Sequence, residues 1–198
     1  MTTTSLMLPQ TELEWRLPSR GCVGMYALIA AEAAIFTIFV VAYLFYVGKS
    51  LSGPTPREVL SPPFFYSVCL LSSSLTIHFA GKALRRGNVR SFGAWWLLTI
   101  TLGALFLFGT ASEWHRLIYR DGLTIGTNLF GTTYYSLVGL HGFHVVVGLA
   151  CLTTVMAFTL FGALKQEHAE RVDVLSLYWH FVDTVWIVVF TVVYVIGR

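Results

Sequence analysis

The sequence predicts an all-α integral membrane protein built as a bundle of five transmembrane helices. Hydrophobic residues make up 56% of the 198 residues and charged residues only 12%, about half the charged fraction of a typical soluble domain. The mean hydropathy is +0.69. Five apolar stretches are long enough to cross a hydrocarbon core, which needs about 20 helical residues. None of them alternates between apolar and polar residues as a membrane-spanning strand does.

The five stretches follow one another with loops between them. The first is too long for a cleaved signal peptide, and it contains Glu32. The second begins after Pro62 and Pro63, which the start of a helix tolerates. The fourth is the longest, so we expect it to tilt or to extend beyond the interface. The predicted helices span residues 22–47, 64–83, 92 to about 112, 129–164 and 174–197.

Lysine and arginine in the loops predict the orientation. Eight of them lie in the N-terminal tail and in the second and fourth loops, and five lie on the opposite side. Because cytoplasmic loops are enriched in these residues, we expect a cytoplasmic N-terminus and an outside C-terminus. Residues 1–20 are then a cytoplasmic tail, and residues 21–198 are one transmembrane domain.

Charge and cysteine content exclude several classes of protein. The net charge of +3 is small and spread over loops, which argues against a nucleic-acid partner. Cys22, Cys69 and Cys151 lie in or beside apolar runs without a pairing pattern, so we interpret them as buried apolar residues. We find no catalytic nucleophile constellation and no phosphate-binding loop, and therefore predict no catalytic residue in this chain.

Polar side chains inside the apolar stretches are the candidate site residues, because a polar group in lipid is costly unless a partner receives it. Two pairs have helical spacing, since His141 and His144 lie three residues apart, as do His180 and Asp183. Glu113 lies near the outer end of the third stretch. The candidates are Glu32, Glu113, His141, His144, His180 and Asp183.

Each candidate has a structural interpretation and a functional one. Glu32 is either a protonated carboxyl group hydrogen-bonded inside the bundle or a group that handles protons or contacts lipid. His141 and His144 are either metal ligands or structural hydrogen-bonding groups, and we favour the structural role. Asp183 is expected to accept a hydrogen bond from His180 or from a donor on an adjacent helix. Close helix packing is expected at Gly139, Gly142 and Gly148.

Two long motifs carry a family resemblance. GLHGFHVVVG from Gly139 to Gly148 and YWHFVDTVW from Tyr178 to Trp186 resemble subunit III of the haem-copper terminal oxidases, cytochrome c oxidase above all. Three shorter segments fit as well: Ala31-Glu32, TASEW from residue 110 to 114, and NLFGTTY from residue 128 to 134. The resemblance extends over residues 22–197 and is closest to the five-helix bacterial form.

The resemblance implies an accessory subunit in aerobic respiration, located in the bacterial inner membrane. Such a subunit carries no haem and no copper, which belong to subunits I and II, and it binds phospholipid. It contacts subunit I, stabilises it and supports proton uptake, with subunit II, a small subunit IV or a respiratory supercomplex as further partners. By resemblance, Glu32 is the reactive intramembrane acid, and His168 lies where a lipid headgroup or a proton-collecting residue belongs.

Other functions remain open at this stage. A subunit III of a quinol oxidase, or the related accessory protein of a nitric oxide reductase, fits the same motifs. A more distant alternative is a haem-binding membrane cytochrome that uses His78, His141, His144 and His180, which requires histidines opposed on different helices. A transporter with Glu32 and Asp183 as coupling acids requires inverted repeats and broken helices, and neither is evident.

Overall fold

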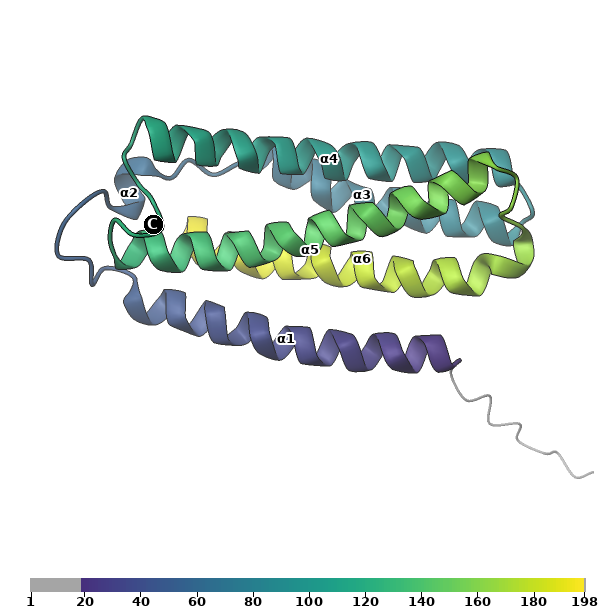
Figure 1. Ribbon diagram of the computed structural model, residues 1–198, viewed down its shortest axis with the longest axis horizontal. Coiled ribbons are helices and arrows are strands. Elements are labelled where there is room, and N and C mark those ends of the chain that lie inside the picture. The colour runs from purple at the N-terminus through teal and green to yellow at the C-terminus, as the bar shows by residue number, and fades with distance from the viewer. Residues whose placement is uncertain (1–18, 198) are drawn as a thin grey trace, which may run out of the picture.

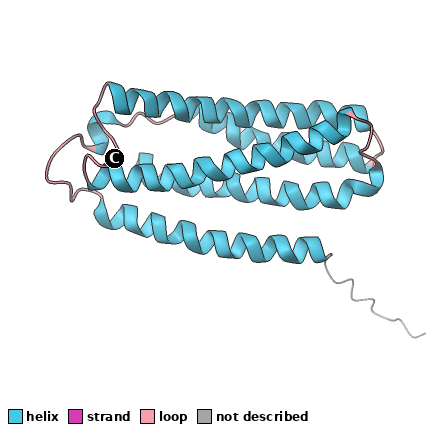
Figure 2. Ribbon diagram, viewed as in Figure 1, coloured by secondary structure: helices cyan, strands magenta, loops and turns pink. Residues whose placement is uncertain are grey.

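The computed structural model describes residues 19–197 and contains only helices and loops over that range (Figure 2). Apart from Ser19 and Arg20, the predicted cytoplasmic tail lies outside the described residues. Five helices are long and apolar enough to cross a membrane, which confirms the predicted fold class. They are α1 (Arg20–Tyr46), α3 (Phe64–Arg85), α4 (Val89–Tyr119), α5 (Leu129–Leu160) and α6 (Ala169–Phe190). A 3₁₀ turn, η1 (Gln166–His168), precedes α6, and a π-helical segment, η2 (Thr191–Ile196), continues it.

The helix ends differ from the predicted ones where local hydrogen bonds decide them. Helix α4 begins three residues early because the Asn88 side chain accepts a hydrogen bond from the Ser91 N–H at 3.0 Å. It also continues to Tyr119, so Glu113 lies inside the helix and not at its last residue. Helix α5 ends at Leu160, earlier than predicted, because Gly162 adopts a φ of +70° and turns the chain.

One short helix was not predicted. Helix α2 (Pro56–Val59) lies in the loop between α1 and α3. The Thr55 backbone N–H donates to the Glu58 carboxylate at 3.0 Å, as in a capping box, and Pro56 occupies the first helical position. The spacing Thr-Pro-x-Glu is typical of the start of a helix. The segment is too short, however, to show the apolar periodicity from which a helix is predicted.

The helices pack as a bundle in which α6 is the most buried and α1 the least (Figure 1). Helix α6 contacts α1, α3 and α5, while α4 packs between α3 and α5. Helix α1 lies on the outside of the bundle, where it contacts α5 and α6. Its outward side chains are large and apolar, such as Ile38, Val41 and Phe45. This face is therefore suited to lipid or to an apolar partner helix.

A buried tryptophan fixes α6 against three other helices. The Trp179 ring fits between two glycines, since a Cβ atom at Gly103 or Gly148 would lie within 3.0 Å of it. Its indole N–H donates to the Ser73 hydroxyl on α3 at 2.7 Å. Larger residues at either glycine would displace the ring, so the packing of the Trp179 ring against α4 and α5 depends on both glycines.

Candidate functional site

The candidate polar residues form separate small clusters at different depths in the bundle. The first joins α1 to α5, where the Glu32 carboxyl group lies 3.1 Å from His144 Nε2. The side chains of Glu32 and His144 are 23% and 8% exposed. The pair is thus nearly buried, with the acid on its more accessible side. Glu32 has the hydrogen-bonded position that one of the two interpretations required.

The second nitrogen of His144 determines how protons are distributed in this pair. His144 Nδ1 lies 2.8 Å from the Leu140 carbonyl oxygen, which only accepts, so Nδ1 carries a proton. If the ring is neutral, Nε2 accepts and Glu32 donates as a protonated acid. If Glu32 is ionised, His144 is protonated on both nitrogens. In either arrangement the pair carries no net charge, which lowers the cost of placing it in an apolar region.

His141 lies on the same helix but has a different role. It is fully buried, and its ring stacks on Trp186 with centroids 4.9 Å apart. The rings of Phe36 and Phe106 meet it edge-on. Neither ring nitrogen has a hydrogen-bond partner within residues 19–197, so the structural hydrogen bond expected for both histidines is present at His144 and absent at His141. His141 acts as an aromatic packing residue.

A second cluster lies toward the other end of the bundle. Glu113 was predicted as a candidate residue, but its tyrosine partners were not. The Tyr194 hydroxyl donates to Glu113 at 2.8 Å and lies 3.4 Å from the hydroxyl of Tyr134. Tyr194 belongs to η2, 81 residues after Glu113. No local spacing in the sequence could have indicated that contact. The cluster links α4, α5 and the end of α6.

A third cluster contains the predicted pair His180 and Asp183. The two side chains are joined through Ser74 of α3, whose hydroxyl donates to Asp183 and lies 3.0 Å from His180 Nδ1. Of the two expected arrangements, the structure has the one with a donor on an adjacent helix. Asp183 is 3% exposed, and its second oxygen has no hydrogen-bond partner in the described chain.

His168 lies at the surface in η1, at the end of the bundle where α1 begins. Its Nδ1 accepts from the Lys165 backbone N–H at 3.1 Å. It borders a pocket of about 360 Å³ whose lining combines apolar side chains with two basic ones. The lining residues are Val155, Phe158, Ala163, Leu164, His168, Arg171 and Val172.

The three glycines of α5, at which close helix packing was expected, do not form one packing face. Gly148 faces Trp179, and Gly139 faces Trp114 on α4, where an added Cβ would lie 3.3 Å from the ring. Gly142 has no heavy atom within 4 Å of its Cβ position. The physical reason is the helical period, because nine residues place Gly139 and Gly148 on opposite sides of the helix.

The surroundings of the α5 histidines bear on whether they could be metal ligands. Residues 19–197 contain no group of three His, Cys, Asp or Glu side chains placed to hold a metal ion. His141 is enclosed by aromatic rings, and His144 uses both nitrogens on Glu32 and Leu140. Two of the four histidines that a membrane cytochrome would require, His141 and His144, are therefore engaged in other contacts.

Comparison with known proteins gives matches along nearly the whole chain. A family profile described as "Cytochrome c oxidase subunit III" matches residues 21–198. The chain is 33% identical to cytochrome c oxidase subunit 3 of Alkalihalophilus pseudofirmus, over 88% of this chain and 86% of the relative. It is 36% identical to that of Synechocystis sp., over 90% and 77%. It is also 32% identical to the cytochrome bo(3) ubiquinol oxidase subunit 3 of Pseudomonas aeruginosa, over 88% of this chain and 84% of the relative.

The profile spans nearly the whole chain, and these relatives are more than 30% identical to it. This protein therefore belongs to the cytochrome c oxidase subunit III family.

Proposed function

We propose that the chain is a non-redox accessory subunit of a proton-pumping haem-copper oxidase in a bacterial cell membrane. It stabilises subunit I and supports proton uptake, while haem and copper are held by subunits I and II. The observation that carries this proposal is the Glu32–His144 contact. In this contact His144, the best candidate metal ligand of α5, is hydrogen-bonded to a carboxyl group. The contact also attaches the peripheral helix α1 to the bundle.

The metal content of the chain tests this function. We expect the purified full chain to contain no stoichiometric iron or copper, because the two histidines of α5 are engaged in hydrogen bonds or aromatic packing. The measurement is elemental analysis together with an absorption spectrum. A haem band, or one metal ion per chain, would support the membrane cytochrome instead.

A quinol oxidase is the second candidate complex, favoured by the relative from Pseudomonas aeruginosa named as a ubiquinol oxidase subunit. The donor is set by subunit II. A dinuclear copper motif in the subunit II that purifies with this chain supports cytochrome c as donor, and a subunit II without it supports quinol.

We assign the end of the bundle that holds the start of α1 to the cytoplasm, as the loop charges predict. Phospholipid is the proposed ligand at the pocket beside His168 and Arg171, because its apolar lining and basic rim match an acyl chain and an anionic headgroup. Subunit II, a small subunit IV or a supercomplex are further proposed partners.

Contact with subunit I is proposed along the open side of α5. Replacing Gly142 with Leu is expected to reduce retention of the chain in the detergent-purified complex, since the added side chain clashes with no atom of the chain itself. Gly24→Leu on α1 is the matched control, because that glycine also has no neighbour within 4 Å. Equal retention of both variants, measured as subunit III content per subunit I, contradicts this docking surface.

A further inference from the structure

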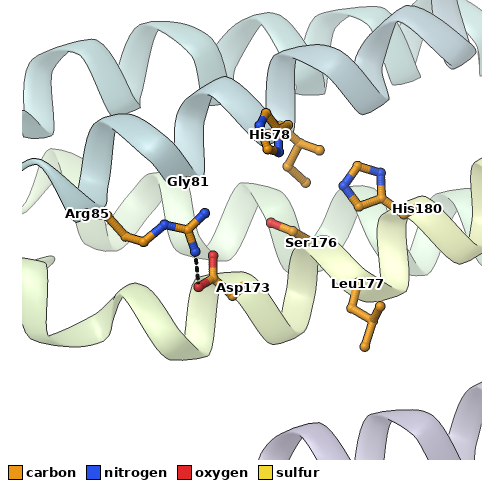
Figure 3. Close-up of a pocket in the computed structure, with 8 residues that line it drawn as sticks. His78, Gly81, Arg85, Asp173, Ser176, Leu177 and His180 are labelled. Atoms are coloured by element: carbon orange, nitrogen blue, oxygen red, sulfur yellow. Dashed lines mark hydrogen bonds and ion pairs between the residues drawn. The ribbon is translucent and has the colours of Figure 1, made fainter.

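A pocket of about 280 Å³, lined by both polar and apolar side chains, opens between α3 and α6, beside the Asp183 cluster (Figure 3). Five of its lining residues are polar or charged, namely His78, Arg85, Asp173, Ser176 and His180. One water molecule needs a cavity of about 10–15 Å³, so this pocket has room for several. Its side chains offer several hydrogen-bond partners for them. In a membrane-spanning bundle, these polar and charged side chains can hydrogen-bond to water in the pocket.

The mouth of the pocket lies near the surface. Arg85 is the last residue of α3 and forms an ion pair with Asp173, one turn into α6. From Asp173 to Asp183 the helix advances ten residues, or about 15 Å along its axis. His78 and His180 lie between these levels and face one another across the pocket. Titratable groups therefore connect the surface to the buried acid.

The last step of this connection is a hydrogen-bonded relay. With Asp183 ionised, the single Ser74 hydroxyl proton is donated to the carboxylate, so His180 Nδ1 must be the donor to Ser74. That assignment leaves His180 Nε2 unprotonated in the neutral ring. The ring lines the pocket, so water there can reach Nε2.

We propose that this pocket is a water-filled proton inlet that connects the aqueous surface at the Arg85–Asp173 pair to the carboxyl group of Asp183. A proton from pocket water binds His180 Nε2. The Nδ1 proton then passes to Ser74 Oγ, and the Ser74 hydroxyl proton passes to Asp183. The products are a neutral His180 that carries its proton on Nε2 and a protonated Asp183, so one proton has entered and no other group changes charge.

The neighbouring titratable groups indicate that Asp183 is the final proton acceptor of the inlet. Of the titratable groups on helices packed against α6, His78 lies in the pocket itself, while Glu32 pairs with His144 and His141 stacks on Trp186. Gly81 keeps the mouth open, because its Cβ position lies 3.4 Å from the Asp173 carboxylate and 3.8 Å from the Arg85 guanidinium. A large side chain at position 81 would fill this space.

Hydrogen–deuterium exchange at the carboxyl group of Asp183 tests the inlet. The probe is the infrared carboxylic C=O band of the purified complex after transfer to D₂O, assigned by its loss in Asp183→Asn. We expect Ser74→Ala and Gly81→Leu each to slow exchange of this band by at least about tenfold. Ser74→Thr retains the hydroxyl and is expected to restore the rate. Ser72→Ala, the same change two residues earlier on α3, is the control and leaves the rate unchanged.

Three results would overturn the inlet: no band that depends on Asp183 at any pH at which the complex is stable, unchanged exchange in Ser74→Ala and Gly81→Leu, or equal slowing in Ser72→Ala. Thermal unfolding of each variant identifies any that is misfolded. If Ser74→Ala is misfolded, the exchange rate of Ser74→Thr is compared with that of the unmodified complex instead. The oxidase assignment is judged by metal content, so failure of the inlet is distinguishable from failure of the proposed function.

Discussion

Trp179→Ala is expected to destabilise the bundle by about 3–5 kcal/mol. The ring is fully buried, fills the slot between Gly103 and Gly148, and donates to Ser73, so its removal leaves a cavity at the contact of four helices. The loss appears as a lower unfolding temperature of the chain in its complex. Leaving the buried Ser73 hydroxyl without its indole donor adds to the cost.

Trp95→Ala is the matched control, because Trp95 is 36% exposed at the surface of α4. We expect it to cost much less than Trp179→Ala. If the two variants unfold at the same temperature, the Trp179 slot does not hold the bundle together as described.

Glu32→Gln is expected to preserve oxygen reduction and proton pumping at first and to shorten the number of turnovers before activity is lost. The glutamine amide can donate to His144 Nε2, as a protonated Glu32 does, so the contact between α1 and α5 survives. The variant removes only the ionisable proton. Within the described part of α1, the other polar side chains near Glu32 are few, and Thr37 bonds its own helix. We therefore expect that Glu32 is not part of a continuous polar path across the bundle.

Glu32→Ala separates the hydrogen bond from the proton. It leaves His144 Nε2 without a partner in a nearly buried position, at a cost of about 1–3 kcal/mol, and should weaken the attachment of α1 as well. The comparison of both variants in a proton-pumping assay and a multiple-turnover oxygen assay is the measurement. If Glu32→Gln abolishes pumping from the first turnover in an intact complex, Glu32 lies on the proton path and this account of it is wrong.

The sequence predicts the five helices well because each is a long apolar run, and that signal is local. Helix ends were less predictable, as at Asn88 and Gly162, where one side chain or one φ angle sets the boundary. For contacts between helices, the sequence indicated which polar residues need a partner but not which residue that partner is. The spacing of His180 and Asp183 indicated a polar pair, yet the bridging hydroxyl comes from Ser74, more than 100 residues away.

Packing details were the least predictable. Helical spacing placed His141 and His144 on one side of α5 but could not show that one pairs with Glu32 and the other stacks on Trp186. That difference depends on which side chains α1 and α6 bring to each position. Of the glycines of α5, Gly139 and Gly148 lie against tryptophan rings and Gly142 has no neighbour, because their angular positions around the helix differ.

The most direct test of the central claim is to purify the oxidase complex without this chain and follow its haem spectrum and oxygen consumption over many turnovers. An accessory subunit without a redox centre predicts unchanged haem bands and near-normal initial oxygen reduction, followed by faster loss of activity than in the complete complex. Restoring the chain should restore the lifetime. Loss of a haem band, or no oxygen reduction from the first turnover in an otherwise intact complex, would contradict the claim.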